Sequence, residues 1–390
     1  MATSELNWLL KRGVAETIIE DELVKLLESG KPLRLKQGFD PSCPDIHLGH
    51  VVGLRKLHQF QERGHRVVLI VGDWTAQIGD PSGQSATRPM LSPEEVQANA
   101  QTYMKQFFKV VDKDKTEVRW QSEWFRKFGL EDVIKLTSKF TVAQFLARED
   151  FNKRYNSGRP IAITELLYPL LQAYDSVAIE ADVEFGGTDQ KFNCLVGREL
   201  QQIMGQRPQQ VFLVPLLVGT DGSQKMSKSL GNYIGIDEPP NDIYGKVMSI
   251  PDILIIDYLE LVTDVPDKEI AEFKEQIASG SVNPMTIKKR LAYEIVAQFH
   301  GNEAAREAEK QFTKSIQKRD PDMRVKIGLS ATLSAELTRA GLTKSRAEAR
   351  RLIAQGAIEI EGQKVNKDLN MSEIGPDKKI DVGKRRFAST

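Results

Sequence analysis

The chain has 390 residues, 40% of them hydrophobic, and its 54 basic and 54 acidic side chains give a formal net charge of zero. This length allows two or three domains with separate cores. The two cysteines, Cys43 and Cys194, form no close pair in the sequence, which argues against a disulfide framework or a zinc site. The apolar runs are too short to cross a bilayer, and the N-terminus lacks the apolar core of a signal peptide, so we expect a cytoplasmic enzyme without a membrane partner.

The first third of the chain predicts a strand–helix–strand unit. Apolar residues at helical spacing over residues 5–28 predict one or two helices that precede the core. A short strand leads into Gly38, residues 47–64 have the pattern of a helix, and the β-branched run at 66–72 is typical of a strand buried on both faces. The expected connection is a right-handed crossover in a parallel sheet.

The loop between this first strand and helix, GFDPSCPDIHLGH over residues 38–50, places two histidines at a helix N-terminus. The first helical turn has backbone N–H groups without helical partners and carries the positive end of the helix dipole, so His47 and His50 lie where an anion would bind. Gly49 leaves room for a flat ligand against the backbone. The alternative is that two histidines three residues apart simply share a helix face.

The α/β pattern continues after a long interruption. Residues 92–178 are predicted to be mainly helical, as an insertion between the two halves of the core. A strand, a glycine loop and a helix then follow from residue 183, and another buried strand is expected over 211–218. Polar loops, including 78–83 and the one after residue 218, fall at strand ends, where ligands bind in open α/β sheets.

The C-terminal part predicts two further domains. Residues 235–317 have helical patterns with charged faces, and 318–332 are polar and turn-prone, as in a linker. Two short helices and a hairpin over 357–365 are expected within a final α+β module at 333–390. From residue 321 onward there are 14 Lys and Arg against 9 Asp and Glu, which favours an anionic partner.

Two lysines in the segment KMSKS stand out for their chemistry. Lys225 and Lys228 lie in a loop flanked by Gly222 and Gly231. Two mobile ammonium groups suit a triphosphate whose negative charge grows on a departing pyrophosphate. The alternative is an ordinary solvated basic loop.

A third group of polar residues forms a stripe on a predicted helix. Tyr168, Gln172 and Asp175 are spaced to share one helix face, while leucines flank them on several sides. The stripe could be the exposed face of an amphipathic helix. If it is buried instead, the carboxylate needs a partner, and a substrate hydroxyl would serve.

The segments HLGH at 47–50 and KMSKS at 225–229 together resemble the two signatures of the class I aminoacyl-tRNA synthetases. In that family the first lies under the adenine and phosphates of ATP, and the second closes over the pyrophosphate. The resemblance therefore implies that His47, His50, Lys225 and Lys228 are catalytic. Other adenylyl-transferring enzymes share the histidine signature, but they lack the lysine loop and the added RNA-binding domains.

The helix with the polar stripe is similar to the tyrosine-binding helix of the tyrosyl-tRNA synthetases, and the similarity covers nearly the whole chain. It implies that Asp175 accepts the phenolic hydroxyl group, that Tyr168, Gln172 and Asp80 hold the α-ammonium group, and that Gln190 lies near the carboxyl group. The residues implied around ATP and the adenylate are Gly38, Asp40, Gly49, Gly187, Asp189 and Lys228. One position departs from the pattern, because Lys36 stands where many members have a tyrosine that also contacts the substrate hydroxyl.

The final module is similar to the S4 RNA-binding domain. Its basic residues Lys344, Arg346, Arg350 and Arg351 surround the second expected helix, and a second basic patch follows at 384–386. On charge alone this is equally well an ordinary solvated face. The resemblance favours a grip on an RNA backbone.

The resemblance as a whole implies a Rossmann-like catalytic domain over 1–234, a helical anticodon-recognition domain over 235–317 and an S4-like domain over 333–390. The implied substrates are L-tyrosine, ATP with Mg²⁺ bound through its phosphates, and tRNA(Tyr), with no metal held by the protein itself. The insertion at 92–178 would form a homodimer interface. The rival interpretations are a tryptophanyl-tRNA synthetase and an RNA-binding or scaffolding protein that has lost catalysis.

Overall fold

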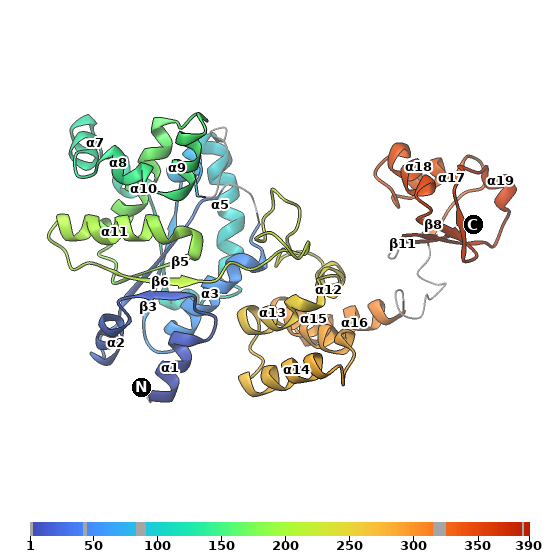
Figure 1. Cartoon of the computed structure of the whole chain (residues 1–390), viewed down its shortest axis with the longest axis horizontal. Coiled ribbons are helices and arrows are strands. Elements are labelled where there is room, and N and C mark those ends of the chain that lie inside the picture. The colour runs from blue at the N-terminus through green and yellow to red at the C-terminus, as the bar shows by residue number, and fades with distance from the viewer. Residues whose placement is uncertain (1–2, 42–44, 83–90, 315–324, 384–385) are drawn as a thin grey trace. The chain divides into compact units, whose positions relative to one another are not determined.

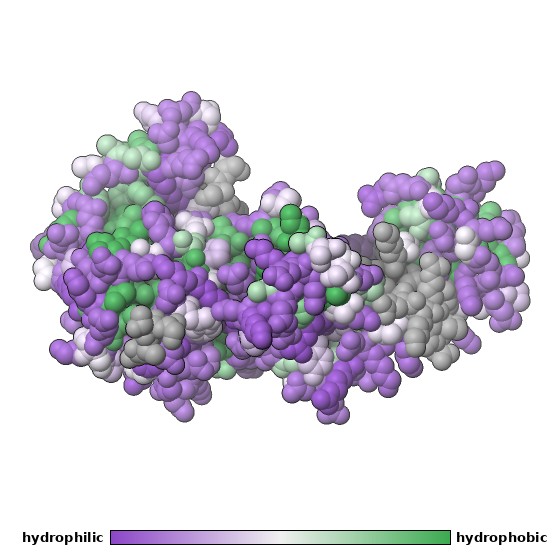
Figure 2. Space-filling view, turned by 60° about the horizontal axis from the view of Figure 1, so that its bottom comes forward, coloured by the Kyte–Doolittle hydropathy of each residue, from purple (hydrophilic) through white to green (hydrophobic). Residues whose placement is uncertain are grey.

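A computed structural model describes residues 3–41, 45–82, 91–314, 325–383 and 386–390. The chain divides into two compact units, residues 1–299 and 300–390 (Figure 1). Hydrophilic residues cover most of the face of the molecule that Figure 2 presents. None of the helices in the described ranges is both long and apolar enough to cross a membrane.

The first unit is built on a six-stranded sheet with the order β1-β6-β5-β2-β3-β4. Its strands are β1 (Glu16–Ile18), β2 (Arg34–Phe39), β3 (Arg66–Val71), β4 (Thr116–Trp120), β5 (Val183–Gly187) and β6 (Gln210–Val214). All neighbours are parallel except β1, which runs antiparallel to β6. The chain builds outward from β2 through β3 to β4, and then from β5 to β6 on the other side. The strand order therefore reverses between β2 and β5, the point at which such sheets bind ligands.

Helices surround this sheet and extend the first unit beyond it (Figure 1). The long ones next to the sheet are α3 (Leu48–Gln61), α5 (Pro93–Phe107), α10 (Ile163–Ala178) and α11 (Lys191–Ile203). Shorter helices are α1 (Thr3–Lys11), α2 (Glu20–Glu28), α4 (Thr75–Ile78), α6 (Ser122–Phe125), α7 (Leu130–Thr137), α8 (Val142–Leu146) and α9 (Glu149–Asn156). The predicted parallel α/β core with its mainly helical central region is confirmed.

Two strands of this six-stranded sheet were not predicted from the sequence. β4 lies inside the stretch that was expected to be helical, and it extends the parallel sheet beside β3. Its sequence, TEVRW, has no continuous apolar run, because all five side chains of this edge strand are only half-buried. β1 has three residues and pairs with β6. Both are edge strands, whose weak pattern follows from having a neighbour on one side only.

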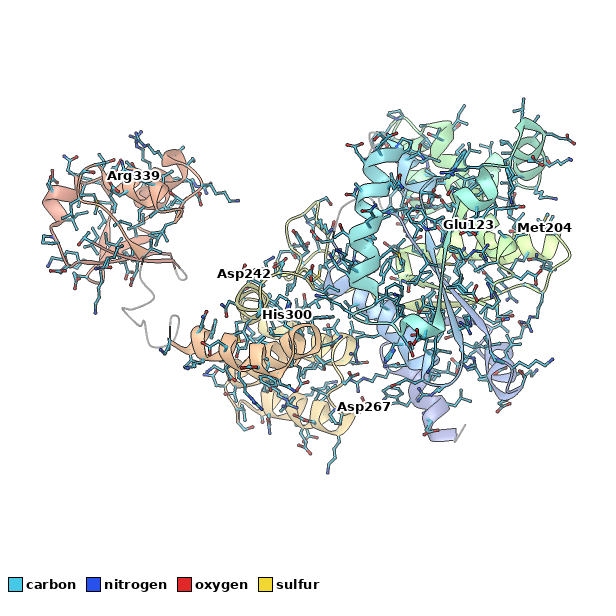
Figure 3. The ribbon with its side chains drawn as sticks, turned by 180° about the vertical axis from the view of Figure 1, so that it is seen from behind. Glu123, Met204, Asp242, Asp267, His300 and Arg339 are labelled. Atoms are coloured by element: carbon cyan, nitrogen blue, oxygen red, sulfur yellow. The ribbon has the colours of Figure 1, made fainter. Side chains whose placement is uncertain are left out.

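The helices after residue 239 pack on the sheet domain within the same unit. They are α12 (Pro240–Met248), α13 (Ile255–Val262), α14 (Asp267–Ser279) and α15 (Pro284–His300). The Tyr258 hydroxyl donates to the carbonyl of Val218 at 2.6 Å, and Arg12 pairs with Asp267 at 2.8 Å (Figure 3 labels Asp267). The first compact unit therefore continues past residue 234, where the sequence suggested a domain boundary.

The second unit contains α16 (Asn302–Phe312) and a small α+β module. A five-stranded sheet has the order β7-β11-β10-β8-β9, formed by β7 (Val325–Lys326), β8 (Ile358–Ile360), β9 (Gln363–Val365), β10 (Lys379–Val382) and β11 (Arg386–Ser389). Its helices are α17 (Leu333–Arg339), α18 (Arg346–Ala354) and α19 (Met371–Ile374). The predicted hairpin is confirmed, and its turn residues Glu361 and Gly362 both have positive φ angles, as a tight two-residue turn requires.

Candidate active site

A cleft of about 750 Å³ opens in the first unit where β2 and β5 end. It collects residues from segments that are far apart in the sequence. Of the predicted catalytic, ATP-binding and tyrosine-binding residues, those lining it are Gly38, Asp40, His47, Gly49, His50, Asp80, Tyr168, Gln172, Asp175, Gly187, Asp189, Gln190 and Lys225. The remaining one, Lys228, is not part of the lining.

The two histidines build the start of α3. His47 is the N-cap, and its Nδ1 accepts a hydrogen bond from the backbone N–H of Gly49 at 3.1 Å. In turn, the Nδ1 of His50 accepts a hydrogen bond from the backbone N–H of His47 at 3.2 Å. This is a capping box made of imidazoles. Since both Nδ1 atoms are acceptors, each neutral ring carries its proton on Nε2.

This geometry corrects the sequence-based view of the helix N-terminus. The N–H groups of the first turn are not left without partners: Leu48 donates to the carbonyl of Ile234, and Gly49 donates to His47. An added Cβ at Gly49 would lie 2.9 Å from the His47 ring, so the glycine makes room for this ring, and it also lines the cleft. The N–H groups that this segment can still offer to the cleft are therefore those of its side chains.

Burial keeps both imidazoles uncharged. Desolvation, with a contribution from the charge of Lys228, lowers the pKa of His50 to about 4. Desolvation and the neighbouring His50 lower the pKa of His47 still further. At neutral pH the pair therefore acts through N–H donors and not as two cations.

The two lysines of the KMSKS loop lie in different environments. Lys225 forms an ion pair with Asp189, with Nζ and Oδ2 separated by 2.8 Å, and its side chain is 41% exposed. Such a partly exposed pair is weak and can be exchanged for a stronger anion. The Lys228 Nζ lies 5.8 Å from the ring centroid of Tyr103, a residue of the cleft lining.

The polar stripe of α10 lines the cleft, with Tyr168 and Asp175 buried and Gln172 half-buried, so the surface interpretation is wrong. The Tyr168 hydroxyl donates to Asp40 Oδ2 at 2.8 Å, and burial next to Asp40 raises the pKa of this phenol well above its usual range. Tyr168 thus stays protonated and uncharged. Across the cleft, the Gln190 Nε2 donates to Asp80 Oδ2 at 2.7 Å.

Asp175 is only 2% exposed, and both of its carboxylate oxygens accept hydrogen bonds. Gln121 Nε2 donates to Oδ2 at 2.8 Å, and Trp124 Nε1 donates to Oδ1 at 3.2 Å. Burial raises the pKa of Asp175 to about 7, although Lys36 and these two donors oppose the shift. The hydrogen bonds from Gln121 and Trp124 hold the carboxylate in one orientation at the cleft wall.

Sequence reasoning did not single out Gln121 or Trp124. Gln121 also lines the cleft, and its Oε1 accepts from the backbone N–H of Thr75 at 3.0 Å, which fixes which end of the amide faces Asp175. Both residues follow β4, the strand that the sequence did not reveal. A correct assignment of that strand would have placed them at the carboxyl edge of the sheet.

The predicted RNA-binding residues lie outside the cleft, in the second unit. The side chains of Lys344, Arg346, Arg350 and Arg351 are exposed on and before α18, and Arg350 Nε lies 3.3 Å from Asp368 Oδ2. Arg346 and Arg350 are four residues apart on one helix face. Of the second basic patch, residues 384 and 385 lie outside the described residues.

Comparisons with known proteins agree with this geometry. Residues 28–317 match the family model of the tRNA synthetases class I (W and Y), and residues 333–368 match the S4 domain. Tyrosine–tRNA ligase from Dehalococcoides mccartyi (strain CBDB1) is 61% identical over 390 residues, which cover 99% of this chain and 98% of that protein. Tyrosine–tRNA ligase from Carboxydothermus hydrogenoformans is 53% identical to this chain, and the match covers 97% of this chain and 96% of that protein.

Solved structures share the fold. The tyrosyl-tRNA synthetase of Archaeoglobus fulgidus in complex with L-tyrosine superposes with a TM-score of 0.63 at 24% identity, covering 79% of this chain and 99% of that one. A C-terminally truncated mitochondrial tyrosyl-tRNA synthetase from Aspergillus nidulans gives a TM-score of 0.66 at 22% identity, with 79% and 92% covered. The chain belongs to the class I tRNA synthetases of the tryptophan and tyrosine family, with an S4 domain at its C-terminal end.

Proposed function

We propose that this protein is a tyrosine–tRNA ligase, which activates L-tyrosine with ATP and transfers it to the 3′-terminal adenosine of tRNA(Tyr). The observation that carries this proposal is a single cleft with a buried carboxylate, Asp175, and a separate group of N–H donors and lysines around His47. The buried carboxylate suits a phenolic hydroxyl group, and the N–H donors and lysines suit phosphates. The names of the relatives, at up to 62% identity over nearly the full chain, support the same substrates.

The first step needs no covalent bond to the protein. A carboxylate oxygen of tyrosine attacks the α-phosphorus of ATP, a new C–O–P linkage forms, and the bond from this phosphorus to the leaving oxygen breaks to release pyrophosphate. The protein then contributes alignment and charge stabilisation. In the second step a ribose hydroxyl of the tRNA attacks the activated carbonyl carbon, and AMP leaves.

At the phosphate end, His47 and His50 donate hydrogen bonds from their Nε2–H groups to the charge that develops on the α-phosphate. Lys225 and Lys228 stabilise the departing pyrophosphate, for which Lys225 leaves its pairing with Asp189. The residues that we place around the ribose and adenine are Gly38, Asp40, Gly49, Gly187 and Asp189. All of these groups except Lys228 line the cleft, which supports the assignment.

At the tyrosine end, Asp175 accepts the phenolic O–H. Tyr168, Gln172 and Asp80 surround the α-ammonium group. The hydroxyl of Tyr168 already donates to Asp40, so its oxygen remains available as an acceptor for an ammonium N–H. Gln190, held by Asp80, lies near the substrate carboxylate.

Mg²⁺ would enter with ATP. Among the residues that the structure describes, no three His, Cys, Asp or Glu side chains gather in a way that could hold a metal ion. We propose that phosphate oxygens and water supply its ligands, which suits the preference of Mg²⁺ for oxygen ligands and retained waters. Its chemistry is to neutralise phosphate charge.

The tRNA that reacts in the second step is the ligand that we propose for the basic residues of the second unit. We propose that Lys344, Arg346, Arg350 and Arg351 bind the phosphate backbone of tRNA(Tyr), while the helical region at 235–317 recognises the anticodon. Phosphate contacts give an affinity that falls steeply with salt. Since tRNA and ATP are substrates, we place the protein in the cytoplasm.

A second copy of the chain is the proposed partner of the region at 92–178. Large apolar side chains are strongly exposed here: Leu130 is 76%, Ile134 58%, Val142 60% and Ile163 78% exposed. They come from α7, α8 and the start of α10, and α7 contacts α10. Exposed apolar groups of this size commonly mark interfaces.

The homodimer predicts a defined mass in solution. Light scattering should give twice the chain mass, and Ile163→Glu should shift the protein to the monomer because it buries an unpaired charge at the interface. Ile253→Glu, at an 82% exposed position in the helical region, is the matched control and should leave the dimer intact. A wild-type monomer at micromolar concentration would contradict the proposal.

The raised pKa of Asp175 predicts an acid limb in the pH profile for tyrosine. Burial raises this pKa to about 7, so lowering the pH below 7 protonates the carboxylate and removes the charged acceptor for the phenolic hydroxyl. kcat/KM for tyrosine should fall about tenfold per pH unit below this point. The histidines of the cleft do not titrate there, since His50 has a pKa of about 4.

Gln121→Met provides the check on this assignment. The variant removes an N–H donor that lowers the pKa of Asp175, so the limb should move to higher pH. Steady-state kinetics from pH 5 to 9 measure the shift. An acid limb that stays in place in this variant would show that another group titrates.

The overall function is tested by amino-acid-dependent exchange of pyrophosphate into ATP. We expect exchange with tyrosine and none with tryptophan. Exchange with tryptophan alone would make the protein a tryptophanyl-tRNA synthetase, and exchange with neither would favour the RNA-binding protein that has lost catalysis.

A further inference from the structure

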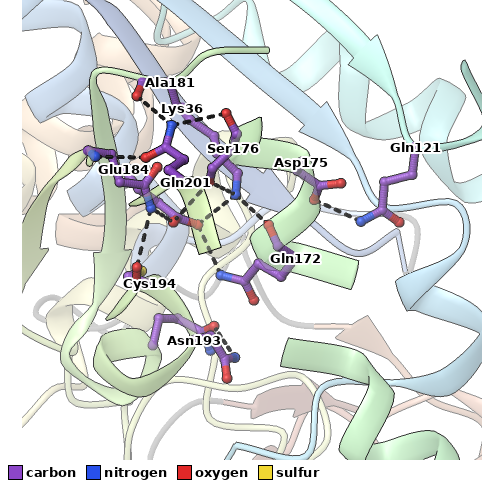
Figure 4. A network of polar contacts seen from close by, with 12 residues as sticks. Lys36, Gln121, Gln172, Asp175, Ser176, Ala181, Glu184, Asn193, Cys194 and Gln201 are labelled. Atoms are coloured by element: carbon purple, nitrogen blue, oxygen red, sulfur yellow. Dashed lines mark hydrogen bonds and ion pairs between the residues drawn. The ribbon is translucent and has the colours of Figure 1, made fainter. Parts of the chain in front are cut away.

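Behind the tyrosine end of the cleft lies a buried ion pair. Lys36 on β2 and Glu184 on β5 are direct neighbours in the parallel register, at the point where the strand order reverses. Their side chains are 0% and 1% exposed, and Nζ lies 2.9 Å from Oε1 (Figure 4). Such a pair contributes little net stability, because desolvation offsets the attraction between the charges. Stability therefore does not explain why this ion pair lies next to a substrate pocket.

The ammonium group of Lys36 is fully used inside the protein. Its three N–H donors meet three acceptors, the carbonyl of Gln172 at 2.7 Å, the hydroxyl of Ser176 at 2.8 Å and the carboxylate of Glu184. Gln172 and Ser176 lie one turn apart on α10. Lys36 does not line the cleft, so it has no donor to offer to a substrate and instead holds this helix against the sheet.

The carboxylate of Glu184 can only accept hydrogen bonds, and this decides the orientation of Gln172. Its oxygens receive N–H groups from Lys36, from Gln172 Nε2 at 3.1 Å and from Gln209 Nε2. The Gln172 amide must therefore turn its nitrogen toward Glu184. Its Oε1 is left on the other side, and Gln172 is a residue of the cleft lining (Figure 4).

We propose that Lys36 and Glu184 are positioning residues for the α-ammonium group of the substrate, because together they fix the Gln172 amide with its oxygen toward the cleft. An amide that was free to rotate could present its NH₂ group to the ammonium, which would repel it. The charge of Lys36 makes the buried carboxylate possible, and the carboxylate selects the amide orientation. This inference rests on the proposed tyrosine site and concerns its ammonium end only.

Two ligands that each lack one group of tyrosine test the proposal in the full-length protein. Tyramine has the ammonium group but no carboxylate, and 3-(4-hydroxyphenyl)propionate has the carboxylate but no ammonium group. Glu184→Gln lets Gln172 rotate, because an amide at position 184 can donate as well as accept. In competition with tyrosine during pyrophosphate exchange, tyramine should bind roughly 10-fold more weakly to this variant, as for the loss of a hydrogen bond to a charged group. The inhibition constant of the propionate should not change.

A second variant and a double-mutant cycle distinguish the positioning role from a general effect on folding. Lys36→Met combined with Glu184→Leu removes both buried charges while keeping the volume, and it should show the same selective loss for tyramine. In a Gln172→Ala background, Glu184→Gln should cause no further loss, since the oriented amide is already absent. The matched control is Glu165→Gln, which weakens another buried ion pair of α10, that with Arg154. It should leave the ratio of the two inhibition constants unchanged.

The outcomes separate this inference from the proposed function. Equal weakening of both ligands, or additive effects of Glu184→Gln and Gln172→Ala, would overturn the positioning role. A changed preference for tyrosine over phenylalanine with an unchanged tyramine constant would overturn it as well, by placing the effect of the pair at the phenol end. Absence of tyrosine-dependent exchange in the wild-type protein would instead contradict the function itself.

Discussion

Asp175→Asn should lower kcat/KM for tyrosine by on the order of 10²- to 10³-fold, while the binding of ATP stays close to that of the wild type. The phenolic hydroxyl loses a buried charged acceptor, and truncating such a pair costs roughly 2–5 kcal/mol. The effect is sharpened because both oxygens of Asp175 have fixed donors, Gln121 and Trp124. An Asn side chain has only one oxygen for them, so its NH₂ group must face one N–H donor.

Pyrophosphate exchange at varied tyrosine and ATP concentrations gives this measurement, and phenylalanine serves as the reference substrate. Because phenylalanine has no hydroxyl group, its low activity should change far less than that of tyrosine. A near-normal KM for tyrosine in Asp175→Asn would refute the assignment. A parallel loss for ATP would indicate that the variant damages the whole cleft instead.

Removal of residues 333–390 should leave tyrosine-dependent exchange intact and reduce tRNA charging on the order of 10²-fold at physiological salt. The deleted module lies in the second compact unit and has its own core, which includes Leu333, Leu337 and Ile380. The loss follows from the phosphate contacts that the basic residues around α18 would supply.

A fourfold replacement by Gln of Lys344, Arg346, Arg350 and Arg351 tests the same claim without a deletion. It should raise KM for tRNA and flatten the dependence of charging on salt, because fewer counterions are released on binding. Aminoacylation at two salt concentrations measures both effects. Equal loss of exchange and charging in the deletion variant would mean that the module stabilises the first unit.

The sequence was sufficient for the parts of the fold that have strong patterns. The continuous β-branched run of β3 and the helical spacing of α3 predicted the crossover unit. Of the signature residues predicted to be catalytic, His47, His50 and Lys225 line the cleft. The edge strand β4 was missed because its five half-buried residues form no continuous apolar run, although the alternation of charged and apolar residues in TEVRW is itself typical of a half-buried strand. Gln121, which follows it, was missed for the same reason.

Side-chain partnerships were the second class of feature that the sequence could not supply. Lys36 looked like a gap in the tyrosine site, since it replaces a residue that contacts the substrate in many family members. Its acceptors come from positions 136 to 148 residues later in the chain, so only the folded structure shows that it is fully bonded inside the core. The histidine pair likewise proved to be a helix cap, a role that depends on backbone geometry.

A crystal structure with a non-hydrolysable tyrosyl adenylate analogue tests the central claim most directly. We predict that the phenolic oxygen lies within hydrogen-bonding distance of Asp175, the ammonium group within reach of Gln172 Oε1 and Tyr168, and the phosphate beside His47 and His50. An analogue bound with its phenol ring at the histidines, or outside this cleft, would contradict the proposed site.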